Sequence, residues 1–116
     1  MKTILVAEDN DSNYLLMTYI LKKNYLVERA INGKLAVDRV EQGGIDLVLM
    51  DMKMPVMDGI EATKLIKEKH PDLPVVALTA NAFDTDRQLA LASGCDEFLA
   101  KPVNAQKCLE TISKFI

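Results

Sequence analysis

The chain has 116 residues, 49% of them hydrophobic, which is the size and composition of one ordinary globular domain. Its 17 acidic and 14 basic side chains give a formal net charge of −3. This balance provides neither the basic stripe that direct nucleic-acid binding needs nor the polybasic patch that attaches proteins to anionic membranes. We therefore expect residues 1–116 to form a single domain that neither contacts nucleic acid itself nor inserts into a membrane.

The residues that most often bind zinc or form disulfides show no recognised spacing. Cys95 and Cys108 form no CxxC pair, and His70 is the only histidine. The pattern argues against a zinc site or a disulfide framework and favours reduced, structural thiols. The apolar N-terminal segment ends at Glu8, so it is too short for the core of a signal peptide or for a membrane span. The prediction is a cytoplasmic setting.

Short apolar runs alternate along the chain with longer stretches of helical periodicity. The runs predict strands at Thr3–Ala7, Leu26–Ala30, Asp46–Met50, Val75–Leu78 and Glu97–Ala100. A first helix is predicted after a cap at Asp11 or Ser12, and the others over about residues 33–42, 58–69, 84–93 and 104–115. The inward stripe of the first helix is predicted to be Asn13, Leu16, Met17, Ile20 and Leu21. Runs as continuous as residues 47–50 are buried on both faces, so the alternation predicts a doubly wound α/β fold with a parallel sheet.

Polar residues stand where four of the predicted strands end. Glu8 and Asp9 follow the first strand, Asp51 the third, Thr79 the fourth and Lys101 the fifth. The carboxyl ends of parallel strands meet at one edge of the sheet, where ligands of open α/β folds bind. Each residue alone has an ordinary explanation, because strand-end Asp commonly forms turns and lysine is commonly a surface residue. Their coincidence at one edge is what predicts a site.

Three carboxylates packed together repel one another unless a cation neutralises them. Mg²⁺ suits Glu8, Asp9 and Asp51, because it prefers oxygen ligands and is commonly held by one or two carboxylates plus phosphate oxygens. Calcium is less expected, since the sequence has no EF-hand loop. A cis bond before Pro102 could turn Lys101 into the same site, and the sequence leaves that isomer open.

Four segments of the sequence resemble the receiver domain of two-component response regulators. They are residues 4–10, 49–59, 77–80 and 101–102, which read ILVAEDN, LMDMKMPVMDG, ALTA and KP. Each segment alone is weak evidence, whereas the four in this order are highly specific. The resemblance covers essentially the whole chain and implies a flavodoxin-like (βα)5 fold, with five parallel strands in the order 2-1-3-4-5.

The resemblance implies a role for each polar residue at the sheet edge. Asp51 would accept a phosphoryl group, and Glu8 and Asp9 would hold Mg²⁺ together with Asp51 and the backbone carbonyl of Lys53. The phosphoryl group would come from a phosphohistidine on a partner. Such a chain catalyses only its own phosphorylation and dephosphorylation, so it is a signalling phosphoacceptor rather than an enzyme.

The resemblance also implies a switch. Thr79 and Lys101 would bind oxygens of the phosphoryl group, and Phe98, at the aromatic switch position, would change rotamer as Thr79 moves. From the residues alone, Phe98 is equally well explained as a core aromatic on the last strand. Phosphorylation would reshape the surface formed by the fourth helix, the fifth strand and the fifth helix. The sequence leaves open whether a phosphorylation-dependent homodimer forms through the fourth and fifth helices.

Within that family, the sequence is most similar to the receiver modules of hybrid histidine kinases, on the basis of Asn10, Asn13 and residues 79–83. The implied partner is a histidine kinase or a histidine phosphotransfer domain, met in the cytoplasm or on the cytoplasmic side of a membrane-bound hybrid kinase. The predicted docking surface lies off the inward stripe of the first helix and comprises Tyr14, Leu15, Thr18 and, nearby, Val103. Scattered surface hydrophobicity, which is common, is the alternative explanation of the same residues, and docking is the favoured one.

Two other functions use similar residues. A haloacid-dehalogenase-like phosphatase also has a nucleophilic Asp and Mg²⁺, but that family needs a second Asp where Lys53 stands, and 116 residues leave little room for a cap over a substrate. A pseudo-receiver has the same fold with a decayed site and works only as a binding module. Because every site residue is present in this sequence, the phosphoacceptor is the favoured hypothesis.

Overall fold

A computed structural model describes residues 1–80 and 84–116 of the chain; residues 81–83, which contribute to the hybrid-kinase resemblance, lie outside the described residues. Within the described ranges, strands and helices alternate as β1 Thr3–Ala7, α1 Asp11–Leu21, β2 Leu26–Ala30, α2 Gly33–Glu41, β3 Leu47–Asp51, α3 Gly59–Lys69, β4 Val75–Thr79, α4 Asp84–Ala92, β5 Glu97–Ala100 and α5 Ala105–Ser113. Among these helices, none combines the length and the apolar character that crossing a membrane requires.

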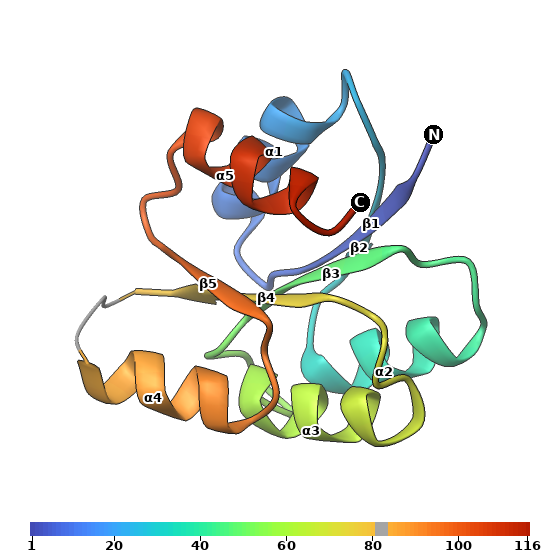
Figure 1. Cartoon of the computed structure of the whole chain (residues 1–116), viewed down its shortest axis with the longest axis vertical. Coiled ribbons are helices and arrows are strands. Elements are labelled where there is room, and N and C mark those ends of the chain that lie inside the picture. Colours follow the sequence, from blue (N-terminus) through green and yellow to red (C-terminus); the bar gives the residue numbers. More distant parts are fainter. Residues whose placement is uncertain (81–83) are drawn as a thin grey trace.

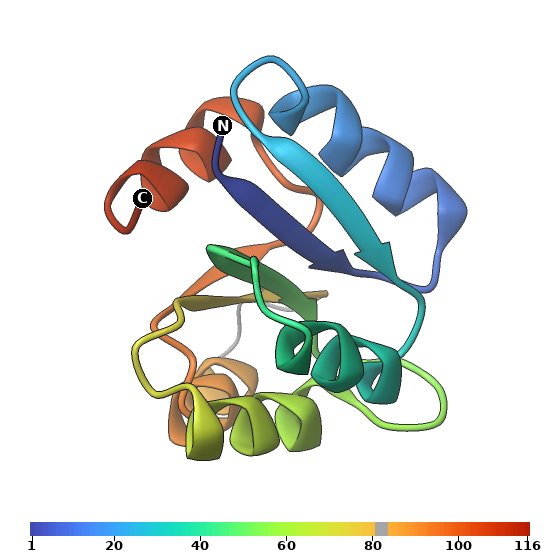
Figure 2. The same cartoon turned by 90° about the vertical axis from the view of Figure 1, so that its right-hand side faces the viewer.

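The strands form one parallel sheet in the order β2-β1-β3-β4-β5, as the sequence and the resemblance predicted. α1 and α5 cover one face of this sheet, and α2, α3 and α4 cover the other (Figures 1 and 2). The order reverses between β1 and β3, because β1 pairs with β2 on one side and with β3 on the other. Open α/β sheets bind ligands at such a reversal, outside the carboxyl ends of the strands.

The continuous apolar runs of the central strands fill two cores, one on each face. Successive side chains of a strand point to opposite faces, so Ile4 and Val6 pack beneath α1 and α5 while Leu5 and Ala7 pack beneath α2, α3 and α4. Every residue of β3 and β4 is buried. This burial on both faces is the reason why these strands show no polar alternation in the sequence.

The start of α1 differs from the prediction. The side chain of Asn10, not Asp11 or Ser12, caps the helix by accepting a hydrogen bond from the backbone N–H of Asn13 at 3.0 Å. Asp11 is instead the first helical residue. Asn, Asp and Ser cap helices about equally well, so a run of all three does not indicate which one is used.

Leu16 was predicted to face inward and does not. Its exposed fraction is 41%, whereas Met17, Ile20 and Leu21 are buried. At about 100° per residue, Leu16 lies at the margin of the stripe that these three residues define. Its side chain therefore belongs to the surface of α1 next to the end of β5, where it lines a small crevice with Val103.

The sequence predicted that the two cysteines are reduced, structural thiols. Cys95 and Cys108 are both buried and are not joined in a disulfide. Burial raises the pKa of both thiols, for Cys108 to about 11. Protonated, buried thiols of this kind act as small apolar side chains of the core.

Candidate functional site

The polar residues at the strand ends meet at one edge of the sheet, beside the reversal of strand order. Glu8 and Asp9 follow β1, Asp51 and Thr79 are the last residues of β3 and β4, and Lys101 follows β5. A cavity of about 640 Å³ opens at this edge, and all of these residues except Glu8 line it. Glu8 lies behind the others, 1% exposed. The structure thus brings together every polar strand-end residue that the sequence singled out.

Three carboxylates form the acidic part of the site. Glu8, Asp9 and Asp51 each offer an oxygen atom, and these oxygens lie within 4.8 Å of one another. Glu8 and Asp51 are buried, and Asp9 is exposed. Burial and the neighbouring Asp51 carboxylate raise the pKa of Glu8 above its ordinary value. Converging carboxylate oxygens of this kind are the donor set that hard divalent cations prefer.

Lys101 supplies the positive charge of the site. Its Nζ donates to Glu8 Oε1 at 2.9 Å and to Asp51 Oδ2 at 3.2 Å. Burial alone lowers the pKa of Lys101, but the hydrogen bonds and charges of both carboxylates outweigh burial and raise that pKa. The bond between Lys101 and Pro102 is cis, which resolves the isomer that the sequence left open.

The loop after β3 fixes the position of Asp51. The backbone N–H of Lys53 donates to Asp51 Oδ1 at 3.1 Å, so both carboxylate oxygens have donors. Gly59 N donates to Met52 O at 3.1 Å, and a Cβ at Gly59 would lie 2.1 Å from the carbonyl oxygen of Asp51. Only glycine allows α3 to begin this close to the end of β3. Asp58 then caps α3 by accepting from Glu61 N at 2.9 Å.

Comparison with known proteins shows to which family the chain belongs. The response regulator receiver domain matches residues 4–113. The chain belongs to this family. The receiver is 41% identical over 123 residues to hybrid signal transduction histidine kinase M of Dictyostelium discoideum, a match that covers 97% of this chain and 5% of that relative. The chain therefore spans only a small part of such a kinase.

Two solved structures are similar to this receiver over nearly its whole length. One is the receiver domain of sensor histidine kinase PA1611 from Pseudomonas aeruginosa, with a magnesium ion coordinated in its active-site cleft; it has a TM-score of 0.92 and 33% identity, and 98% of this chain and 96% of that chain are covered. The other pairs the histidine phosphotransfer protein Ypd1 of Saccharomyces cerevisiae with the receiver domain of the response regulator Ssk1, with a TM-score of 0.92, 33% identity and coverage of 98% and 88%.

The two predicted switch residues of the receiver lie on adjacent strands. Thr79 is 4% exposed at the end of β4 and borders the cavity. Phe98 is half-buried on β5 and packs against the core beneath α2, α3 and α4. Lys101 N donates to the carbonyl oxygen of Thr79 at 2.7 Å, so the segment that carries Lys101 is bonded directly to the end of β4.

The predicted docking residues are exposed to different degrees. Leu15 is 65% exposed, while Tyr14 and Val103 are half-buried. Thr18 is half-buried as well, and its Oγ1 is buried with no hydrogen-bond partner among the described residues. Leu16, for which the helical periodicity predicts a core position, adds apolar surface instead.

Lys101→Met tests the role of Lys101 as a counter-charge. The substitution keeps the apolar stem but leaves Glu8 and Asp51 without their ammonium partner, so we expect the free energy of unfolding to fall by about 3 kcal/mol in Mg²⁺-free buffer. Urea denaturation of both proteins measures the difference.

Lys114→Met is the matched control, since Lys114 forms a 3.9 Å surface ion pair with Glu97 and its side chain is 63% exposed. We expect that variant to change stability by less than about 1 kcal/mol. Equal losses in the two variants would contradict the role assigned to Lys101.

Proposed function

We propose that residues 1–116 form one receiver unit in which Asp51 accepts a phosphoryl group from the phosphohistidine of a partner protein. The observation that carries the proposal is the convergence of Asp51 with Glu8 and Asp9 within 4.8 Å, with Lys101 Nζ bonded to two of the three carboxylates. A buried Asp held between fixed positive charge and an acidic metal-binding pair is suited to phosphoryl transfer, in which positioning and charge stabilisation account for nearly all of the catalysis.

The donor set of the site fits Mg²⁺. Glu8, Asp9 and Asp51 supply carboxylate oxygens, and the backbone carbonyl of Lys53, at the rim of the cavity, would complete the protein ligands. When bound, Mg²⁺ neutralises charge on the phosphoryl oxygens during transfer. The magnesium ion in the receiver of PA1611 supports this assignment.

The chain's own residues then account for the chemistry. A carboxylate oxygen of Asp51 forms the new bond to phosphorus as the bond from phosphorus to the donor imidazole breaks, and the electron pair of that bond stays on the imidazole nitrogen. The product is an acyl phosphate on Asp51. Lys101 Nζ and the Thr79 hydroxyl would bind phosphoryl oxygens, on which charge is spread in the transition state. Because Lys101 is already fixed beside Asp51, little reorganisation is needed.

The same contacts provide a route for switching. If Lys101 Nζ transfers its hydrogen bonds from Glu8 and Asp51 to the phosphoryl group, its backbone moves with it, and Lys101 N is bonded to Thr79 O. Phe98 would change rotamer as Thr79 moves and would thereby alter the surface of α4, β5 and α5. A coupling of about 1 to 3 kcal/mol changes partner affinity 5- to 150-fold. Leu91 on α4, 42% exposed, supplies apolar surface for a homodimer that forms on phosphorylation.

The partner would be a histidine kinase or a histidine phosphotransfer domain that docks on α1. Leu15 and Leu16 on α1, with Val103 across a small crevice lined also by Glu8 and Lys101, provide an apolar surface next to the site. The complex of Ypd1 with the receiver of Ssk1 supports a partner of this kind. The setting would be the cytoplasm or the cytoplasmic side of a membrane-bound hybrid kinase, in keeping with the kinase relatives.

The two alternative functions fit the site less well. A dehalogenase-like phosphatase needs a second catalytic Asp where this chain has Lys53. The backbone N–H of Lys53 donates to Asp51 Oδ1, and the Lys53 side chain is exposed. A pseudo-receiver lacks part of the acidic cluster or its lysine, whereas this chain has both in contact.

Acetyl phosphate with Mg²⁺ tests the phosphoacceptor directly. We expect intact-mass spectrometry to detect one added phosphoryl group on the parent chain and none on Asp51→Asn, because the amide is not a nucleophile. Asp58→Asn is the matched control: Asp58 is another carboxylate of the same cavity, and Asn also caps helices, so labelling should persist. A parent that is never labelled, or undiminished labelling of Asp51→Asn, would refute the proposal.

Leu15→Glu tests the docking surface. A charge in a desolvated apolar contact should slow phosphotransfer from a phosphorylated histidine phosphotransfer domain about tenfold, the effect of roughly 1.4 kcal/mol, and leave the reaction with acetyl phosphate unchanged. Leu26→Glu is the control, because Leu26 is similarly exposed, at 54%, but lies at the opposite end of the sheet. Docking on α1 is wrong if both variants transfer at the rate of the parent.

A further inference from the structure

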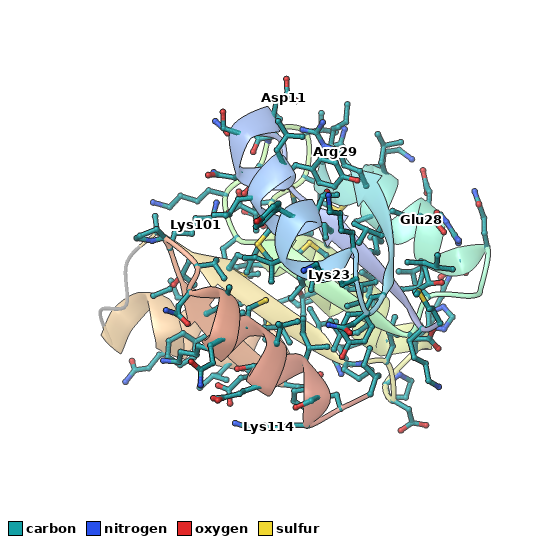
Figure 3. All side chains as sticks on the ribbon, turned by 90° about the horizontal axis from the view of Figure 1, so that it is seen from above. Asp11, Lys23, Glu28, Arg29, Lys101 and Lys114 are labelled. Atoms are coloured by element: carbon teal, nitrogen blue, oxygen red, sulfur yellow. The ribbon has the colours of Figure 1, made fainter. Side chains whose placement is uncertain are left out.

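The side chain of Arg29 reaches from the edge strand β2 to the loop that carries two of the acidic residues. Arg29 lies opposite Val6 in the register of β1 and β2. Its Nε donates to the carbonyl oxygen of Glu8 at 3.1 Å and its Nη2 to the carbonyl oxygen of Asp9 at 3.3 Å. Nη2 also pairs with Asp11 Oδ1 at 2.8 Å, and the two side chains lie next to each other in Figure 3.

These contacts begin where the strand pairing ends. The last register pair of β1 and β2 is Ala7 with Ala30, and one further bond runs from Glu8 N to Ala30 O at 3.0 Å. Glu8 is therefore held by β2 through both backbone groups, its N–H by Ala30 and its carbonyl by Arg29. A carbonyl fixed in this way restricts the backbone rotation that sets where the next side chain, that of Asp9, points.

A guanidinium group is suited to this role. It is planar and donates in several fixed directions, so one arginine can bind two carbonyls and a carboxylate at once. The group also lies over the ring of Tyr14, 4.6 Å from its centroid, which joins the loop to α1. Only 24% of the Arg29 side chain is exposed. An isolated surface ion pair with Asp11, 86% exposed, would not require these additional contacts.

We propose that Arg29 is a positioning residue of the metal site, which holds the backbone of Glu8 and Asp9 so that their carboxylates converge on Mg²⁺. The inference rests on the proposed function in one respect, namely that Mg²⁺ binds between Glu8, Asp9 and Asp51. The outer partners of metal ligands commonly change metal affinity 10- to 100-fold when they are removed.

Charge and position predict opposite effects for this residue. Arg29 is a cation near a bound cation, so loss of its charge alone would tighten Mg²⁺ binding. Loss of its hydrogen bonds to the Glu8 and Asp9 carbonyls would loosen the β1–α1 loop, which carries these two metal ligands, and weaken Mg²⁺ binding. The sign of the change in Mg²⁺ affinity therefore separates a positioning role from a purely electrostatic one.

The experiment is a calorimetric titration of the whole chain with MgCl₂, without phosphodonor, for the parent, Arg29→Met, Arg29→Lys and Arg39→Met. We expect Arg29→Met to weaken Mg²⁺ binding about tenfold. Arg29→Lys should also weaken it, because an ammonium keeps the charge but not the planar fork. Arg39 on α2 is the matched control. It pairs at 2.6 Å with Glu28, which lies on β2 beside Arg29, and its described bonds go to Glu28 and Gly43, not to the β1–α1 loop. Arg39→Met should therefore bind Mg²⁺ like the parent.

Each other outcome has a distinct meaning. Unchanged or tighter Mg²⁺ binding by Arg29→Met overturns the positioning role while the proposed function stands. A parent that binds no Mg²⁺ overturns both. Urea denaturation of each variant establishes that it is folded, and Arg29→Lys, which keeps the stem and the charge, decides the question if Arg29→Met is unstable. If Arg39→Met weakened Mg²⁺ binding as much as Arg29→Met, the lost affinity would come from any disturbance of β2, and the positioning role of Arg29 would be wrong.

Discussion

The hydrogen bonds from Lys101 Nζ to Glu8 and Asp51 are the interaction on which the rest of the site depends. Glu8 is 1% exposed and Asp51 6%, and two carboxylates so placed repel each other in a medium that screens charge poorly. The ammonium group lies 2.9 Å from Glu8 Oε1 and 3.2 Å from Asp51 Oδ2, and it offsets the repulsion between the two carboxylates before any metal ion binds. One ammonium beside the three carboxylates of the site leaves two negative charges uncompensated, which is the condition that attracts a divalent cation.

The sheet is what brings these charges together. Glu8 and Lys101 are separated by 93 positions in the sequence, yet both directly follow strands whose carboxyl ends meet at one edge. Three further constraints set the position of the acidic groups: Gly59 allows α3 to begin against the end of β3, Asn10 caps α1, and Arg29 binds the carbonyls of the β1–α1 loop. The reactive residues thus stand on short connections tied to rigid strands, as precise sites require.

Much of this arrangement could be predicted from the sequence, for physical reasons. Strands buried on both faces must be continuously apolar, so β3 and β4 were evident, and parallel strands must end at one edge, so the meeting of Asp51, Thr79 and Lys101 followed. Local alternatives of similar energy could not be separated. The cap of α1 had several competent neighbours, and the isomer before Pro102 depends on tertiary contacts. Arg29 was missed because its contacts depend on the register of β1 with β2, which no local pattern encodes.

A crystal structure of the chain grown with Mg²⁺ and beryllium fluoride, a mimic of the phosphoryl group, tests whether Asp51 is the phosphoacceptor and Lys101 its counter-charge. We expect beryllium to be bonded to a carboxylate oxygen of Asp51 and Mg²⁺ to be held by Glu8 and Asp9 together with Asp51. Lys101 Nζ should then contact fluorine instead of sharing its hydrogen bonds between Glu8 and Asp51. Beryllium fluoride on another residue, or Lys101 still bonded to Asp51 with no metal ion beside it, would show that Asp51 is not the phosphoacceptor of this site.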